Sequence, residues 1–477
     1  MSIIEELEKR TVSEDTSEVV AASEVDWDVE TNVLVAGAGA CGLTASLTVA
    51  ENTDLQVTML EKDDEIGGNM RLAVGSIPAA GTRIQEDAGI EDSPENMVRE
   101  IMEKANYEAD EEMVRILAEE SRHLISWLLD EVGLELALVT DYLHPRKDTY
   151  RVHSHPEREG PFLVEALGRN VEATDNIELL TNTPVRKLVE EGGEVVGVVA
   201  GMKRTEAIRA EKTILATDGF GQNKQMLREQ IDETVAELYY NGAAGNTGDG
   251  IRWADELGAE LSCMDAYSGY AFMMDVGVFF NYAHLMHGGI MINENGERFA
   301  DESKGYSAFV DDVLDQPGGV AYGIGDGRTN ELLLNNFGGY EDEVQHYATG
   351  DTVEELAEEL GIPPETTAET VERYNEQVKS GGIADFNRTE RLHELDSPPY
   401  YGAQVQPALF FTQGGVVIDE HTRVQRPEGS TIGNLYAGGG VAVGISGHGA
   451  AGYSSGNGLL TALGHGRLAG KHVREVL

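Results

Sequence analysis

The stretch that decides the fold reads TNVLVAGAGACGLTASLTVAENTDLQVTMLEK and covers residues 31–62. It begins with an apolar strand at 33–36, passes through three glycines spaced as GxGxxG, and continues as a helix from about Cys41. A second apolar strand then ends at Glu61. Strand, glycine turn, helix and acid in this order are typical of the dinucleotide-binding unit that opens a parallel α/β sheet.

Each glycine has a mechanical role in such a unit. Gly37 makes the tight turn, Gly39 lets the backbone approach a pyrophosphate, and Gly42 lets the helix pack closely on the strand. Free N–H groups and a partial positive charge at the helix N-terminus attract the phosphates. Glu61, about 20 residues further on, is placed to accept hydrogen bonds from ribose hydroxyls. The unit therefore predicts cofactor contacts at Gly37, Gly39, Ala40, Cys41, Gly42, Glu61 and Lys62.

The segments that follow favour FAD over NAD. Residues 62–82, KDDEIGGNMRLAVGSIPAAGT, contain the glycine pair Gly67 and Gly68 and then small and polar residues, as expected of a loop under a flavin. Residues 181–201 alternate apolar and polar side chains around EEGGE, which predicts a β-hairpin. The buried strand TILATDGFG, 213–221, returns to the parallel sheet, so the hairpin belongs to a small β-meander.

Composition limits the possible partners and the compartment. The chain of 477 residues carries 85 acidic against 35 basic residues, a formal net charge of -50. Such a surface disfavours nucleic acid and anionic membranes, and it is expected of a salt-adapted protein. Its two cysteines provide no disulfide framework, and no metal site is expected. Because no export signal and no apolar run of about 20 residues is seen, we expect a cytoplasmic protein without a membrane span.

Eight ordered motifs resemble the flavoprotein family of fumarate reductase and succinate dehydrogenase. They are GAGACG (37–42), EKDDEIGGN (61–69), LATDGFGQN (215–223), GNTGDGIRWADELGAEL (245–261), GIMINENGERFADE (289–302), TQGGVVID (412–419), NLYAGGG (434–440) and GNGLLTALGHGRLAG (456–470). The resemblance implies an α/β fold: a Rossmann-like FAD-binding domain at 29–264 and 412–477, with a parallel sheet and a β-meander, and an inserted α+β capping domain at 265–411. Residues 1–28 are expected to be an acidic, mobile arm.

The same resemblance implies how FAD is held. No histidine lies between Glu61 and Thr82, where the respiratory members attach FAD covalently, so we expect non-covalent FAD. Since the chain lacks haem and iron–sulfur ligands, a separate electron donor or acceptor is expected. A last helix from near Gly456 is expected to aim its N-terminus at the flavin. The further cofactor contacts implied are Gly67, Gly68, Asn69, Met70, Gly75, Ser76, Val185, Ala216, Thr217, Asp249, Gly439, Gly440, Gly458 and Leu459.

The chain departs from fumarate reductases at all four substrate anchors. Those enzymes hold a dicarboxylate with two histidines and two arginines, one arginine also donating the proton. The segment 263–274 contains no histidine, and the other three positions carry Tyr306, Phe411 and Tyr453. Binding two carboxylates in a closed site without cations costs several kcal/mol per ion. A fumarate or succinate site is therefore not expected.

The replacements resemble the 3-ketosteroid Δ4-(5α)-dehydrogenases, in which a tyrosine handles a proton next to a polarised ketone. This resemblance implies catalytic roles for Tyr306, Tyr453 and Ser455, and a flat, uncharged small-molecule substrate. Lys304 is a candidate partner for Tyr306, His287 and His448 are other candidate proton donors, and Ser455 has a second interpretation as a helix N-cap. The expected pocket residues are Tyr267, Tyr270, Phe272, Phe411, Thr412 and Gly456.

Two alternatives stay open at this point. The first is an ene-reductase of a carboxylate substrate, with Arg298 or Arg83 as a relocated anchor. The second is a flavoprotein subunit that only passes electrons to a partner protein. The substrate, the direction of reaction and the oligomeric state do not follow from the sequence.

Overall fold

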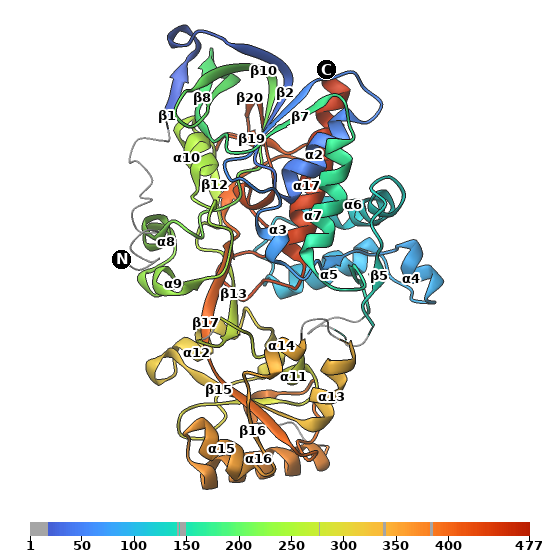
Figure 1. Cartoon of the computed structure of the whole chain (residues 1–477), viewed down its shortest axis with the longest axis vertical. Coiled ribbons are helices and arrows are strands. Elements are labelled where there is room, and N and C mark those ends of the chain that lie inside the picture. The colour runs from blue at the N-terminus through green and yellow to red at the C-terminus, as the bar shows by residue number, and fades with distance from the viewer. Residues whose placement is uncertain (1–17, 141–142, 144–148, 276, 337–339, 382–384) are drawn as a thin grey trace.

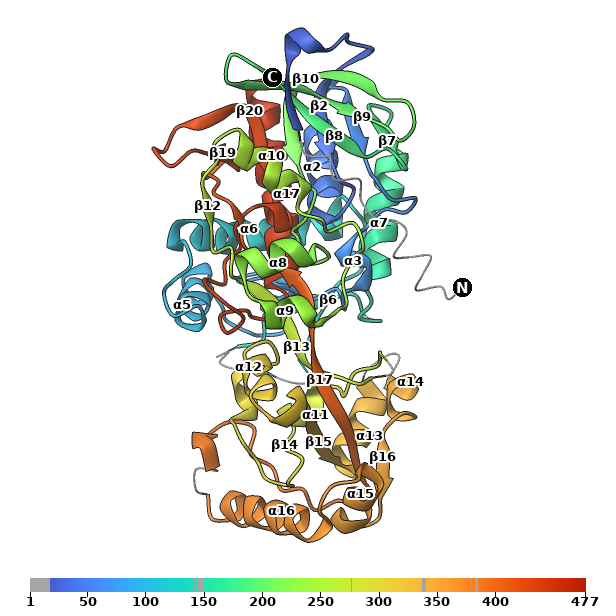
Figure 2. The same cartoon turned by 90° about the vertical axis from the view of Figure 1, so that its left-hand side faces the viewer.

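A computed structural model describes residues 18–140, 143, 149–275, 277–336, 340–381 and 385–477. Figures 1 and 2 show two lobes, with the C-terminal end of the chain at the outer end of the upper lobe. The long strand β17 (Tyr400–Thr412) runs from the lower lobe into the upper lobe, so the two lobes share a continuous backbone element. No helix of the described residues is long and apolar enough to cross a membrane.

A nine-stranded sheet forms the upper lobe in the order β1-β8-β9-β20-β10-β2-β3-β7, with β19 paired to β20. Pairing is parallel along β20, β10, β2, β3 and β7, as expected of the dinucleotide-binding unit. The bounds are β1 Glu18–Ala21, β2 Val29–Ala36, β3 Val57–Leu60, β7 Ile177–Leu180, β8 Val185–Glu191, β9 Glu194–Ala200, β10 Glu206–Leu215, β19 Arg423–Gln425 and β20 Thr431–Ala437.

The predicted hairpin and meander are present. β8 and β9 pair antiparallel through a two-residue turn, in which Gly192 (φ 66°) and Gly193 (φ 92°) both take the left-handed conformation that such turns require. β9 then pairs antiparallel with β10.

The expected arm differs from the structure over residues 18–28. Residues 18–21 form β1, which pairs in parallel with β8 at the sheet edge, in register with residues 187–190. Residues 1–17 lie outside the described residues.

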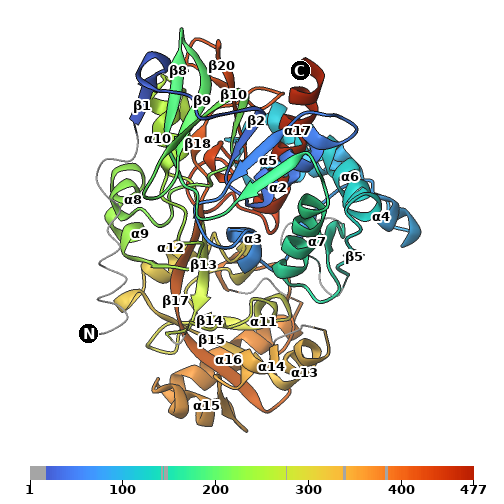
Figure 3. The same cartoon turned by 45° about the horizontal axis from the view of Figure 1, so that its top comes forward.

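Helices surround the upper sheet. Figure 3 shows α4, α5 and α6 grouped on the side of α17, whereas α8 and α10 lie on the opposite side. Their bounds are α2 Ala40–Ala50, α3 Asn69–Leu72, α4 Arg83–Asp87, α5 Pro94–Lys104, α6 Glu111–Asp130, α7 Gly160–Glu172, α8 Lys224–Gln230, α9 Glu233–Glu237, α10 Asp249–Glu256 and α17 Asn457–Val476. Two small sheets complete the lobe: β4 (Ile77–Pro78), β5 (Ala137–Leu138) and β6 (Val152–Ser154), and the pair β12 (Leu261–Ser262) and β18 (Gly415–Val416).

A six-stranded sheet built around β17 forms the lower lobe. Figure 1 shows α11, α12 and α14 on the side that faces the upper lobe, and α15 and α16 at the far end. The bounds are β11 Tyr239–Tyr240, β13 Tyr267–Met273, β14 Ile290–Ile292, β15 Ala321–Asp326, β16 Ala348–Gly350, α11 Ala283–Met286, α12 Val310–Leu314, α13 Gly327–Asn336, α14 Tyr340–Val344, α15 Val353–Leu360 and α16 Pro364–Lys379. Most of these elements fall within 265–411, the range predicted for the cap, although β11 precedes it.

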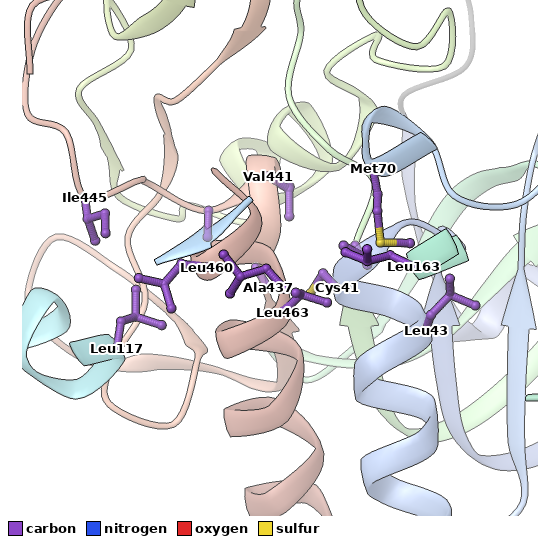
Figure 4. Packing of buried hydrophobic residues seen from close by; sticks show 14 of the residues in the cluster. Cys41, Leu43, Met70, Leu117, Leu163, Ala437, Val441, Ile445, Leu460 and Leu463 are labelled. Carbon is purple, nitrogen blue, oxygen red and sulfur yellow. The ribbon is translucent and has the colours of Figure 1, made fainter. Parts of the chain in front are cut away.

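The packing of α2 against α17 positions the site. Figure 4 shows the two helices side by side, with Cys41 and Leu463 between them. Glycines make this contact close: a Cβ added at Gly466 would lie 2.5 Å from the Cys41 carbonyl oxygen, and one at Gly470 would lie 2.6 Å from the Thr48 Cβ. Larger residues at these positions would push the helices apart.

Candidate active site

A cavity of about 430 Å³ lies between the two lobes, in the size range of small-molecule sites. Most of the residues predicted for the cofactor, the chemistry and the substrate lie on its wall. They are Gly37, Gly39, Ala40, Cys41, Glu61, Lys62, Gly67, Gly68, Asn69, Met70, Ser76, Val185, Ala216, Thr217, Asp249, Tyr270, Tyr306, Phe411, Thr412, Gly439, Gly440, Tyr453, Ser455, Gly456, Gly458 and Leu459.

Two predicted cofactor glycines lie behind the wall. A Cβ added at Gly42 would lie 1.9 Å from the Gly37 carbonyl oxygen, so Gly42 serves the contact between helix and strand and not the ligand directly. Gly75 has φ 72° and packs near Leu163, which makes it a backbone turn beneath the cavity.

Two predicted pocket aromatics also face away from the cavity, which corrects their expected role. Phe272 is fully buried in the lower lobe, where its ring stacks on Tyr282 with centroids 5.6 Å apart. Tyr267 is buried as well, and its hydroxyl donates to Asp311 at 3.5 Å. Strand β13 is buried on both faces, so the alternation of its side chains does not reveal which of them reach the cavity.

The N-terminus of α2 opens onto the cavity and fits a pyrophosphate. Its N-cap is Gly39, and no side chain caps the free N–H groups of the first turn. A Cβ added at Gly39 would meet only the Gly67 carbonyl oxygen, at 4.0 Å, so the protein leaves this space open for a ligand. Beside it, the Glu61 carboxylate accepts hydrogen bonds from the backbone N–H of Ala38 at 2.8 Å and of Asp63 at 2.9 Å. These contacts hold the carboxylate at the cavity wall.

An ion pair supports the same region. The Lys62 Nζ donates to the Thr247 Oγ1 at 2.8 Å and lies 3.3 Å from the Asp249 Oδ2. Burial alone would raise the pKa of Asp249, but the charge of Lys62 and the hydrogen bond from Thr247 outweigh it and lower that pKa. Asp249 is therefore an ionised acceptor at the wall.

A second helix N-terminus meets the cavity at α17. Gly456, with φ 85°, is its N-cap, and no side chain caps it. The alternative interpretation of Ser455 as the N-cap is therefore wrong. The buried Nε2 of Gln413 also lines this region and has no hydrogen-bond partner among the described residues. A flavin ring offers acceptor nitrogen and oxygen atoms that suit both the free N–H groups of α17 and this amide.

Three hydroxyl groups form a cluster beside the α17 terminus. The rings of Tyr306 and Tyr453 lie with centroids 6.1 Å apart. Burial raises the pKa of Tyr306 well above its usual value, the interaction with Tyr453 adds to this, and a hydrogen bond with Ser455 acts in the opposite direction. Burial likewise raises the pKa of Tyr453, against the lowering effect of its hydrogen bond with Tyr306. Both phenols are therefore neutral and hold their protons at pH 7.

The candidate proton-transfer partners and the candidate substrate-binding arginines do not line the cavity. Lys304 forms an ion pair with Asp312 and does not line the cavity. Arg298 is buried in an ion pair with Glu302 at 2.6 Å, and Arg83 pairs with Asp130 at 2.7 Å. Neither arginine lines the cavity, and the same is true of His287 and His448.

A model of the FAD binding domain family matches residues 32–459. The chain belongs to this family of flavoproteins. FAD is therefore its cofactor, and the glycine cradle at α2 and the free N–H groups at both helix termini suit it.

Similar proteins act on carbon–carbon bonds. A probable fumarate reductase of Shewanella frigidimarina is 32% identical over 93% of this chain and 75% of its own length. A 3-oxosteroid 1-dehydrogenase of Mycobacterium tuberculosis is 26% identical over 94% of this chain and 98% of its own length. The structure of a 3-ketosteroid Δ4-(5α)-dehydrogenase from Rhodococcus jostii with 4-androstene-3,17-dione has a TM-score of 0.78 at 26% identity, over 96% of this chain and 99% of that one. The flavoprotein is thus an FAD-dependent oxidoreductase of the CH–CH type.

Several wall residues of this flavoprotein did not emerge from the sequence. Asp218 and Gln413 lie inside two of the quoted motifs, next to predicted contacts, so their position gave a signal. Asn281, Glu343 and Arg158 lie outside every motif, and only the fold brings them to the cavity.

Proposed function

We propose that the flavoprotein acts on a carbon–carbon bond next to the carbonyl of a flat, uncharged substrate of the 3-ketosteroid type. One observation carries the proposal: Tyr306, Tyr453 and Ser455 meet in a cluster of neutral hydroxyls at the cavity wall, where Tyr453 is buried and the other two are half-buried. The adjoining wall is aromatic, since Tyr270 stacks on Phe410 with centroids 5.4 Å apart and an interplanar angle of 4°. Flat apolar rings with one polar end suit such a slot.

The hydroxyl cluster suits a proton at the carbon next to a ketone. FAD bound in the cavity supplies hydride exchange with the neighbouring carbon. Tyr306 holds the proton that is exchanged at the α-carbon, and as a neutral phenol it is ready to donate in the reductive direction. In the oxidative direction Ser455 assists, because its hydrogen bond lowers the cost of removing the Tyr306 proton. The Tyr453 hydroxyl is placed beside them to polarise the ketone oxygen.

Turnover of a ketosteroid by the holoenzyme tests the proposal. The oxidative assay uses 5α-androstane-3,17-dione with an artificial electron acceptor, and the reductive assay uses 4-androstene-3,17-dione with chemically reduced enzyme, both in high salt. Fumarate and succinate serve as controls. We expect turnover in one or both ketosteroid assays and none with the dicarboxylates. Turnover of fumarate alone would refute the proposal.

A carboxylate substrate is the second candidate, and one observation favours it. Arg158 lines the cavity and is the only arginine among the described wall residues. A single guanidinium suits a monocarboxylate better than a dicarboxylate. Titration of the oxidised flavin spectrum with crotonate and with 4-androstene-3,17-dione distinguishes the two candidates. Binding of crotonate that is lost in Arg158→Gln would support the second one.

Cofactor attachment, electron supply and salt adaptation complete the proposal. The described wall residues include no histidine, which supports non-covalent FAD. Electrons are exchanged with a separate carrier. The net charge of -50 supports function in a cytoplasm of high salt concentration. Trichloroacetic acid precipitation tests the non-covalent attachment of FAD, because FAD that is not covalently bound stays in the supernatant.

A further inference from the structure

The cavity wall in the lower lobe carries a carboxyl group that the proposed proton chemistry does not use. Glu343 in α14 lines the cavity together with Asn281, and α14 lies on the side of the lower lobe that faces the upper lobe (Figure 1). The Asn281 Nδ2 donates to the Glu343 Oε2 at 3.1 Å. The amide of Asn281 is fixed in turn, because its Oδ1 accepts a hydrogen bond from the Ala283 N–H at 3.0 Å.

Glu343 has no cationic partner among the residues that the structure describes. The side chain is half-buried, burial raises the pKa of its carboxyl group, and the hydrogen bond from Asn281 opposes this. Its ionisable neighbours are Tyr340 and Tyr347, whose pKa values are raised by burial and then by Glu343 itself. A carboxylate has about four lone-pair sites, so one hydrogen bond leaves lone pairs that a ligand donor can use.

A series of ring contacts leads from the hydroxyl cluster toward this group. The ring centroid of Tyr453 lies 6.1 Å from that of Tyr306, which lies 5.3 Å from that of Tyr270. Tyr270 in turn lies 4.8 Å from Phe279, two residues before the asparagine that binds Glu343. A substrate that reacts at Tyr306 and extends along Tyr270 and Phe279 would bring its other end toward Glu343.

We propose that Glu343 recognises a hydrogen-bond donor, a hydroxyl or ammonium group, at the end of the substrate remote from the reacting bond. This inference rests on the proposed function and amends its substrate class: the reacting end is a flat, uncharged ketone, and the remote end carries the donor group. The free lone pairs of the carboxylate accept a charge-assisted hydrogen bond, whereas a second ketone at that end offers no donor.

Three matched ligands test the inference by binding alone. They are 4-androstene-3,17-dione and its analogues with a 17β-hydroxyl or a 17β-amino group in place of the 17-ketone. Each is titrated into oxidised holoenzyme and followed by the flavin absorbance. We expect the parent to bind both donor-bearing ligands about 10-fold or more tightly than the dione, as a hydrogen bond to a charged group predicts. The ratio between the amine and the alcohol distinguishes the two donor classes.

Two variants test whether the Glu343 carboxyl group causes the preference for ligands that carry a donor group. Glu343→Gln keeps the size, and its one amide oxygen is needed to accept from Asn281, so its NH2 donor faces the ligand and the variant is expected to lose the preference for the donors. Glu341→Gln is the matched control, because Glu341 is an exposed acid of the same helix. Equal affinity of the parent for all three ligands, or an unchanged preference in Glu343→Gln, overturns the inference.

Failure of all three steroids to bind would refute the proposed function and the inference with it, whereas equal binding of all three would overturn the inference alone. The melting temperature of the ligand-free holoenzyme gives a second readout. A carboxyl group kept for a ligand costs stability when the ligand is absent, so Glu343→Gln is expected to melt at the parent temperature or above it. A lower melting temperature would show that Glu343 stabilises the fold, and would overturn the inference.

Discussion

The rings of Tyr306 and Tyr453 lie with their centroids 6.1 Å apart and their planes at 60°, one from the lower lobe and one from the loop that leads into α17. The two residues are 147 positions apart in the chain, and the packing of the lobes brings them together. The hydroxyl cluster therefore depends on the packing of the two lobes against each other.

Removal of the Tyr306 hydroxyl tests its role as the proton carrier. Tyr306→Phe is expected to lower kcat by about 10²- to 10⁴-fold, the usual contribution of a positioned acid or base. The flavin content, measured by absorbance, is expected to remain that of the parent. Tyr267→Phe is the matched control, since that buried tyrosine faces away from the cavity. Equal kcat in Tyr306→Phe and the parent would assign the proton to another group.

The pH dependence of the reductive reaction follows from the raised pKa of Tyr306. A raised pKa keeps the phenol protonated to higher pH, so the donor form is present throughout the neutral and mildly alkaline range. We expect kcat for reduction to stay level from pH 7 to about 9.5, because even an unperturbed tyrosine titrates near 10. A decline in kcat with an apparent pKa near 8 would show that a different acid donates the proton.

Alanine substitutions at two glycines of the first motif are expected to have different effects on the protein. Gly39→Ala fills open cavity space, so the protein is expected to fold, with FAD binding weakened by about 1–3 kcal/mol, the usual cost of overpacking. Gly42→Ala drives a Cβ into the Gly37 carbonyl oxygen and is expected to lower the melting temperature even without FAD. Circular dichroism and the ratio of flavin to protein absorbance separate the two effects. Normal flavin content in Gly39→Ala would contradict the proposed cradle.

A buried ion network supports the segment that carries Tyr306. Glu302 pairs with Arg298 at 2.6 Å and with Arg388 at 3.0 Å, all three side chains being fully buried. Glu302→Gln leaves two buried guanidinium groups without a counter-charge, so we expect a loss of about 3–5 kcal/mol in the free energy of unfolding, measured by denaturant titration. Glu111→Gln, in an exposed pair with Arg115, is the control and is expected to be nearly neutral.

The acidic surface predicts a steep dependence on salt. Repulsion between the excess carboxylates destabilises the fold at low ionic strength, and about 1 M salt shortens the Debye length to roughly 3 Å. The melting temperature and kcat are therefore expected to rise together from 0.2 to 3 M KCl. Sucrose at matched osmolality is the control, because it does not screen charge. A flat response to KCl would reject salt adaptation.

The sequence by itself determined the cofactor unit. The spacing of Gly37, Gly39 and Gly42 and the acid at Glu61 are local properties, because turn, helix start and strand end all lie within one βαβ unit. The hairpin at Gly192 and Gly193 was predictable for the same reason, since a two-residue turn fixes its own register.

Only the tertiary structure decided which side chains face the cavity. Phe272 and Tyr270 lie on one strand that is buried on both faces, and no periodic pattern shows that one of them fills the core and the other the cavity wall. Arg298 lies within a recognised motif, yet its ion pair with Glu302 holds it away from the site. Glu343 lies outside every motif and reaches the cavity through α14. Whether a side chain faces the cavity or is buried in the core depends on contacts between segments that are distant in the sequence. The local spacing of residues does not encode these contacts.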